Sequence, residues 1–290
     1  MPTSGSLALA REWPGLCSTA PLVEERAVVI LVWTLSVTLA FAPLAAQGGP
    51  PLITDDPDTP GPGYWELNVL IQRERTRTAH SDEPLLDLNY GVGRRVQLKL
   101  EAPWVILREA GAESLSGPGN AVAGVKWRFL GEEEQLVAWA IYPQYEFNLG
   151  SASAQKGLVP EGHRVVLPSE LTLEVHRVEV NLEVGRILAS AGPDEWVYGV
   201  STELSLLRRV EFLAEVYGEK ADGTPTELLL HGGARIKAGC QATIMVGGGW
   251  AVAGDPEDRP RLMLSGGVQL NLPGRFDFSR RRSPAATQCK

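Results

Sequence analysis

Three acidic side chains lie close together in the stretch ITDDPDTPGPGYWE (53–66). Asp55, Asp56 and Asp58 carry carboxylate oxygens, which are the ligands that hard cations prefer. Their spacing lacks the pattern of a calcium-binding loop, and prolines surround them. We therefore predict no metal site and interpret residues 47–63 as a solvated segment that leads into the rest of the chain.

The sequence does not indicate a set of catalytic residues either. A nucleophilic serine would need a histidine base and a third orienting group, yet the four histidines are scattered and none has a serine partner that the sequence can nominate. A lone His231 is more often a satisfied polar residue than a base or a ligand. The glycines at 247–249 are followed by no helix whose N-terminus could hold a phosphate, and we expect them to permit bending of a strand. We predict no catalytic residues, no enzyme activity and no cofactor.

Charge and cysteine content exclude further classes of protein. The chain has 290 residues and a net charge of -8. It carries no basic patch of the kind that nucleic-acid binding requires, because its one arginine run, 280–282, lies in the tail. Cys17, Cys240 and Cys289 have no metal-ligand spacing and cannot form a disulfide framework, although a single Cys240–Cys289 bridge stays open.

The N-terminal part reads as an export signal. Residues 27–46, AVVILVWTLSVTLAFAPLAA, are uncharged and mostly apolar, follow Arg26 and end in small residues. A charged flank, an apolar core and a small-residue exit are typical of a secretory signal peptide, which we place at 1–46. The alternative is a retained anchor, since an apolar run of this length can span a bilayer.

The elements that would position any functional side chain are strands. Apolar Trp65, Leu67 and Val69 alternate with polar Glu66 and Asn68, and side chains that alternate in this way point to opposite faces of a strand. Most segments reach the roughly 9–11 residues that a tilted strand needs to cross a bilayer. The sequence predicts twelve strands, at 64–74, 84–92, 95–105, 120–130, 135–147, 165–176, 178–189, 195–206, 209–219, 227–237, 240–252 and 261–272.

The connections between these strands alternate in length. Tight turns follow most even-numbered strands, and longer polar loops follow most odd-numbered ones, for example 75–83, 106–119 and 148–164. Transmembrane barrels have short turns on the periplasmic side and longer loops outside. We therefore predict an all-β fold, a closed antiparallel transmembrane β-barrel over 64–278, with 47–63 on the periplasmic side and a polar tail at 279–290.

A soluble sandwich also alternates, with its polar face in water. Strand length, loop asymmetry and the export signal favour the barrel, whose outer face is apolar and whose inner face can carry charge. Aromatic residues near strand ends, such as Trp104, Trp196 and Trp250, fit interfacial girdles, with core packing as the alternative. The predicted lumen-facing side chains are Glu66, Asn68, Gln97, Lys99, Glu101, Lys126, Arg128, Glu170, Glu174, Glu179, Glu183, Glu211, Glu215, His231 and Arg235.

Three stretches carry a resemblance to a known family. ITDDPDTPGPGYWE (53–66), DLNYGVGRRVQLKLEAPW (87–104) and GPGNAVAGVKWRFL (117–130) resemble the MetA-pathway of phenol degradation family. The resemblance covers about residues 50–272 and implies an outer-membrane barrel, often labelled a transporter, with a link to uptake of aromatic or hydrophobic small molecules. It supplies no binding residues. One departure from barrels in general is the polar tail that follows Phe276 and Phe278.

These observations together predict a channel for small molecules in the bacterial outer membrane. Two alternatives stay open: a structural or binding outer-membrane protein with a closed lumen, and a soluble exported β-sandwich that binds a ligand. The expected partners are outer-membrane lipid, the barrel-assembly machinery and a solute that the sequence does not identify, with no nucleic acid.

Overall fold

The computed structural model describes residues 49–131, 135–176 and 178–274. The predicted signal peptide, Phe276, Phe278 and the polar tail lie outside the described residues. Cys240 is disulfide-bonded, and its partner also lies outside them. Within the described ranges, no helix is long and apolar enough to cross a membrane.

Strands make up nearly all of the described chain, and the one helix, α2 (Ser151–Gln155), is short. The first strands are β1 (Tyr64–Arg75), β2 (Ala79–Val92), β3 (Val96–Glu109), β4 (Leu115–Pro118), β5 (Asn120–Leu130), β6 (Val137–Ile141) and β7 (Gln144–Asn148). The remaining strands are β8 (His163–Val175), β9 (Val178–Ala189), β10 (Glu195–Leu207), β11 (Val210–Ala221), β12 (Glu227–Lys237), β13 (Ala242–Ala253) and β14 (Leu262–Pro273).

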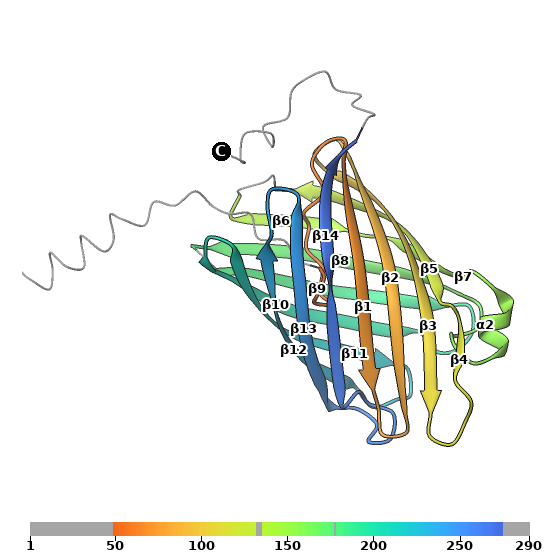
Figure 1. The fold of residues 1–290 in the computed structure, drawn as a ribbon. Helices are drawn as coiled ribbons and strands as arrows, with labels where there is room; N and C mark the ends of the chain where they lie inside the picture. The colour runs from red at the N-terminus through yellow and green to blue at the C-terminus, as the bar shows by residue number, and fades with distance from the viewer. Residues whose placement is uncertain (1–48, 132–134, 177, 275–290) are drawn as a thin grey trace, which may run out of the picture. The chain divides into compact units, whose positions relative to one another are not determined.

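The sheet closes on itself, because β1 pairs with β14 and β3 pairs with β5, always antiparallel. Two places in the wall are each filled by two consecutive strands: the short β4 with the longer β5, and the short β6 with the short β7. Fourteen assigned strands thus form a closed barrel of twelve wall positions (Figure 1), which confirms the predicted fold class and overturns the sandwich alternative.

The break between β6 and β7 has a local cause. Pro143 lies between them and has no N–H to donate to the ladder. The neighbouring backbone still bridges the gap, since the Val125 N–H donates to the Pro143 carbonyl and the Tyr142 N–H to the Pro168 carbonyl, each at 3.0 Å.

Two predicted loops are shorter than expected because the strands run further. The loop predicted at 75–83 is reduced to residues 76–78, since β2 already begins at Ala79. Cross-strand ion pairs stabilise this extension: Asp82 accepts from Arg73 at 2.6 Å and from Arg108 at 2.5 Å. The loop predicted at 106–119 shrinks for the same reason, as β3 continues to Glu109 and β4 fills part of it.

The two faces of the wall are inverted relative to a soluble protein. Val69 and Val125 point outward and are 50% and 45% exposed, whereas their neighbours Asn68 and Lys126 point inward and are each 1% exposed. Apolar side chains on the outer surface and polar groups within suit a wall surrounded by lipid, where every backbone group must be paired internally.

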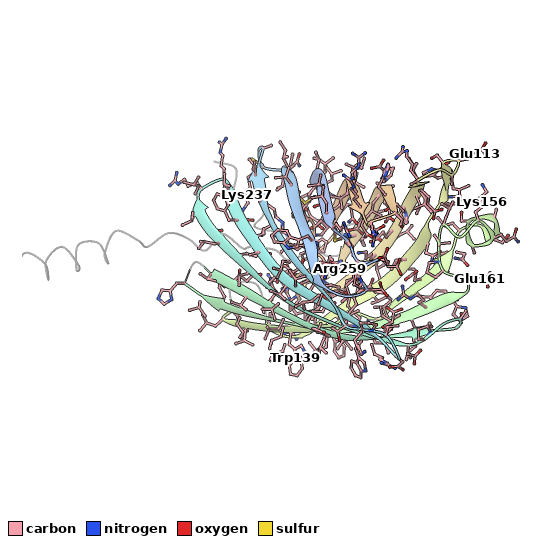
Figure 2. The ribbon with its side chains drawn as sticks, turned by 90° about the horizontal axis from the view of Figure 1, so that it is seen from below. Glu113, Trp139, Lys156, Glu161, Lys237 and Arg259 are labelled. Carbon is pink, nitrogen blue, oxygen red and sulfur yellow. The ribbon has the colours of Figure 1, made fainter. Side chains whose placement is uncertain are left out.

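Aromatic side chains mark both ends of the outer face. Trp65 packs against Tyr90 with the two rings tilted, near the ends of β1 and β2 at the turn end of the barrel, and Trp139 points away from the wall in Figure 2. At the loop end, Trp196 and Trp250 are 49% and 53% exposed. Such exposure favours the interfacial girdles over core packing.

Candidate functional site in the barrel lumen

The predicted lumen-facing residues occupy positions that alternate with the exposed apolar ones around the wall. Ten of them are buried and five are half-buried. Glu66 and Asn68 lie on β1, Gln97, Lys99 and Glu101 on β3, Lys126 and Arg128 on β5, Glu170 and Glu174 on β8, Glu179 and Glu183 on β9, Glu211 and Glu215 on β11, and His231 and Arg235 on β12.

The segment before the first strand occupies the lumen, which differs from the solvated lead-in that the sequence suggests. Residues 49–63, here called the luminal segment, contact strands on opposite walls. Thr54 and Asp56 are 0% and 2% exposed. The physical reason is charge: inward cations and carboxylates supply partners for its acidic side chains and its backbone, which bulk water would otherwise have to provide.

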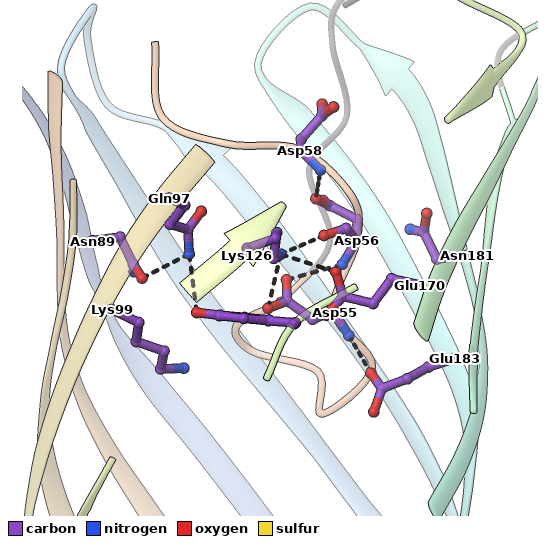
Figure 3. Close-up of polar contacts among 12 residues, drawn as sticks. Asp55, Asp56, Asp58, Asn89, Gln97, Lys99, Lys126, Glu170, Asn181 and Glu183 are labelled. Atoms are coloured by element: carbon purple, nitrogen blue, oxygen red, sulfur yellow. Dashed lines mark hydrogen bonds and ion pairs between the residues drawn. The ribbon is translucent and has the colours of Figure 1, made fainter. Parts of the chain in front are cut away.

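Lys126 is the central anchor of the luminal segment (Figure 3). Its Nζ lies 3.1 Å from Asp55 Oδ2 and 3.2 Å from Glu170 Oε2, and it donates to the Asp56 carbonyl. The same ammonium lies 4.6 Å from the centroid of the Tyr142 ring, which is an attractive cation–π geometry. One cation thus joins the segment to β5 and β8.

Two arginines hold the ends of the same segment. Arg128 Nη1 pairs with Asp58 Oδ1 at 2.6 Å. Arg235, on the opposite side of the sheet order, donates to the carbonyls of Gly49 and Pro50 at 2.9 Å and pairs with Glu203 at 3.0 Å. Both guanidinium groups therefore join the segment to the wall, since Arg128 Nη2 also donates to the Arg94 carbonyl at 2.6 Å, while Arg128 Nε has no hydrogen-bond partner within the described residues.

Wall carboxylates also accept backbone N–H groups of the luminal segment. Glu215 accepts from Ile53 and Thr54 and lies 3.0 Å from His231 Nδ1, and Glu183 accepts from Asp55 at 3.0 Å. Some inward carboxylates of the wall stand directly opposite one another on adjacent strands, as Glu170 does with Glu183 and Glu174 with Glu179. Such like-charge pairs destabilise a sheet, and the segment with Lys126 offsets the repulsion.

Inward glycines leave the space that the luminal segment fills. A Cβ at Gly199 would lie 2.1 Å from Thr54 Oγ1, and one at Gly91 would lie 2.0 Å from the Pro60 carbonyl oxygen. A Cβ at Gly247 would lie 2.7 Å from Ser265 Oγ of the wall and 3.0 Å from Pro51 Cβ of the segment. Bending stays the predicted role of glycines 247–249, and at Gly247 the close approach of Ser265 and Pro51 is a second reason for a residue without a Cβ.

Asp55 and Asp56, two neighbouring residues of the luminal segment, have carboxyl groups whose pKa values shift in opposite directions. Burial raises the pKa of the Asp56 carboxyl well above its usual range, and the adjacent Asp58 carboxylate adds to the rise. Burial also acts to raise the pKa of Asp55, but attraction by Lys126 and Lys99 outweighs it, so the pKa is lowered. Asp55 is therefore the anionic anchor, while Asp56 favours its protonated form.

A cavity of about 360 Å³ lies beside the luminal segment, toward the end of the barrel that carries the longer loops. We call it the outer cavity. The luminal segment forms one side, and β1, β2, β3, β12, β13 and β14 supply the rest. Its volume is near the lower end of the range for pockets that hold small ligands. Its lining includes Leu70, Leu85, Met263, Glu74, Glu83, Asp87, Lys99 and Glu101.

Part of the inner face is apolar. Ile187, Val197, Tyr217, Leu229 and Ala251 form one buried cluster on adjacent strands, with Val166 and Met263 packed against it. The lumen therefore combines a charged section around the luminal segment with an apolar patch. No cluster that could hold a metal ion occurs in the described ranges.

Sequence reasoning did not identify several residues that complete the network. Tyr142 is fully buried and accepts a hydrogen bond from Gln97 at 3.1 Å. Asn181 and Glu203 are also buried on the inner face. Continuing the two-residue period through Val137–Tyr142 and across 195–206 would have placed Tyr142 and Glu203 inside.

Comparisons with known proteins support the fold. No protein-family model and no curated protein sequence matches the chain. The COG4313 outer membrane channel from Pseudomonas putida F1 superposes with a TM-score of 0.62 at 13% identity, over 75% of this chain and 98% of that one. The NanC porin gives 0.54 at 7% identity, over 71% and 100%. The translocator domain of the autotransporter NalP from Neisseria meningitidis gives 0.50 at 9%, over 85% and 95%.

At these identities the likeness is one of fold, and the resemblance to the phenol degradation family is not confirmed. The closed wall, the apolar outer face and these structural neighbours together identify the chain as a β-barrel of the bacterial outer membrane.

Proposed function

We propose that this barrel is a channel for small molecules whose lumen is narrowed by its own luminal segment. The observation that carries the proposal is the way this segment is held. Its contacts with the wall are mainly ion pairs and hydrogen bonds, such as those of Lys126, Arg128 and Arg235. Water and polar solutes can replace such contacts, whereas they cannot replace a packed apolar core.

The proposed solutes have an apolar or aromatic part. Two observations support this: the sequence resemblance to the phenol degradation family, and the apolar cluster around Val197 and Leu229 on the inner face. Solutes with an apolar part would find contacts there that a wholly polar lumen lacks. The proteins of similar fold named a channel and a porin are consistent with the same role.

A closed lumen is the second candidate. Close fitting of the luminal segment favours it, because Gly91 and Gly199 leave no spare room beside Pro60 and Thr54. A barrel whose segment never moves would bind or anchor other molecules rather than conduct.

Planar-bilayer conductance and liposome swelling test the proposal. We would compare the full chain with the double variant Asp55→Asn/Asp58→Asn, which weakens the anchoring of the segment and leaves the wall unchanged. The exposed loop variant Glu113→Gln is the matched control. We expect measurable solute flux in the full chain and a several-fold higher conductance in the double variant alone. Absence of flux and conductance in every variant would leave the closed-lumen candidate.

We further propose export with removal of residues 1–46 and insertion by the barrel-assembly machinery. N-terminal sequencing of the protein purified from outer membranes should begin at Gln47. A product that retains the apolar run would instead support an anchor.

A further inference from the structure

Carboxylates near the loop end of the lumen lack counter-charges. Glu74 and Glu83 line the outer cavity, and no cation of the described chain pairs with either. Glu219 stands directly opposite Glu227 on the neighbouring strand, and Glu74 lies within Coulombic range of both. Like charges in such positions repel, so this end of the lumen would be stabilised by a cation.

The cations nearby are already engaged. Lys99 Nζ lies 2.9 Å from Glu101 and 3.7 Å from Asp87. Arg73 pairs with Asp82. The position of Arg73 on β1 alternates with the inward-facing positions of that strand. Arg164 pairs with Glu195 at 2.9 Å. The outer cavity therefore keeps an excess of negative charge.

Asp87 adds a buried acceptor to the cavity. Its side chain is 3% exposed, and its Oδ2 accepts hydrogen bonds from Asn68 and Asn89 at 3.0 and 3.1 Å. Its Oδ1 accepts no hydrogen bond within the described residues, and the Lys99 ammonium lies 3.7 Å from it. The ion pair with Lys99 compensates the charge of this oxygen, and a donor bound in the cavity could add the hydrogen bond that it lacks.

Apolar surface lies in the same cavity. Leu70 and Leu85 line it from adjacent strands, and Met263 lies among the lining residues of β14. From the luminal segment, Ile53 lines it with 38% of its surface exposed. A ligand that covered this exposed side chain would gain the free energy of apolar burial.

We propose that the outer cavity binds organic cations that carry an ammonium group on an apolar body. The ammonium would lie by Glu74 and Glu83, and the apolar body would pack against Leu70, Leu85 and Ile53. This inference deepens the proposed channel function, on which it rests for its physiological meaning, by naming the class of solute. Organic anions of the same size would meet repulsion from the same carboxylates.

Binding to the full chain in detergent, measured by titration calorimetry, tests the proposal directly. The probes are 2-phenylethylammonium, neutral 2-phenylethanol and anionic phenylacetate, which share an aromatic ring and differ in charge. We expect the ammonium to bind about tenfold more tightly than the alcohol, and phenylacetate to bind most weakly. Equal affinities for the three probes, or preference for the anion, would overturn the proposal.

A variant pair locates the site. Glu74→Gln/Glu83→Gln keeps side-chain size and should reduce ammonium affinity about tenfold while leaving alcohol affinity unchanged. Glu109→Gln, at the exposed end of β3, is the control and should change neither. Undiminished ammonium binding in the double variant would place the site elsewhere. The three-probe comparison on the unmodified chain decides the proposal even if the double variant does not fold.

Conductance separates this inference from the channel proposal. Ammonium binding without any conductance would retain the cation site and exclude the channel. Conductance without charge preference among the probes would retain the channel and exclude the cation site.

Discussion

At the scale of single residues, we expect Lys126 to contribute more to stability than any other residue that holds the luminal segment. Its side chain is 1% exposed, and its ammonium is shared by Asp55, Glu170 and the Asp56 carbonyl. Removing one partner of a buried ion pair costs about 3–5 kcal/mol, because the other charge stays buried without compensation. Lys126→Met should therefore lower the free energy of unfolding by about 3 kcal/mol or more, as measured by urea unfolding in lipid vesicles.

A matched substitution checks that explanation. Lys99→Met removes a lysine whose side chain is 16% exposed, so water can solvate its former partners and the loss should be clearly smaller. Adding Glu170→Met to Lys126→Met should restore part of the stability, since it removes one buried carboxylate that the loss of Lys126 leaves without a partner. Equal losses for the two lysine variants would contradict the role assigned to Lys126.

Sequence alone could place these residues inward but could not assign their partners. A two-residue period decides which face Lys126 and Arg128 occupy. Their partners Asp55 and Asp58 lie about 70 positions earlier. That stretch is rich in proline and shows no alternation of polar and apolar residues from which a strand could be predicted. Acidic residues flanked by prolines look solvated from sequence, because the cations that bury them belong to distant strands.

At the scale of elements, the luminal segment depends on space left by inward glycines. At Gly199, a Cβ would lie 2.1 Å from Thr54 Oγ1, far inside van der Waals contact. Gly199→Ala should therefore displace the segment near Thr54 without opening the wall. We expect a higher bilayer conductance and faster protease cleavage within 49–63 than in the unmodified chain.

Two further variants isolate the steric cause. Gly232 occupies an outward position of β12, where a Cβ meets no atom closer than 3.6 Å, so Gly232→Ala should leave conductance unchanged. Combining Gly199→Ala with Thr54→Ala removes the clashing hydroxyl and methyl and should return conductance toward its original level. No rescue by Thr54→Ala would mean that Gly199 acts through the wall instead.

The positions of the strands could be predicted from the sequence, whereas their interruptions and extensions could not. Alternation and turn residues placed β9 and β12 with the observed bounds, 178–189 and 227–237. The added residues of β2 pair with β1 and β3, and the Arg73–Asp82–Arg108 ion pairs join the three strands there. A polar stretch such as 79–83 looks like a loop unless those cross-strand partners are known.

At the scale of the whole molecule, the outer face must be solvated by lipid. Alternation alone could not distinguish this from a sandwich, because both folds have one apolar face. Ring closure through β3–β5 and β1–β14 decides it, since a single closed sheet has no second layer to cover half-exposed side chains such as Val69 and Val200.

Because lipid surrounds the outer face of the barrel, the free-energy cost of placing a charge on that face should depend on its depth in the membrane. Val200 is 46% exposed near the middle of β10, and Leu207 is 60% exposed at its end. An arginine facing lipid costs about 2–4 kcal/mol at the bilayer midplane and about 0–1 kcal/mol near the interface. Val200→Arg should therefore reduce folding stability in vesicles by about 2–4 kcal/mol, and Leu207→Arg by less than about 1 kcal/mol. Similar losses at both positions would mean that the face is not graded by membrane depth, since in a uniform solvent both exposed sites would tolerate arginine alike.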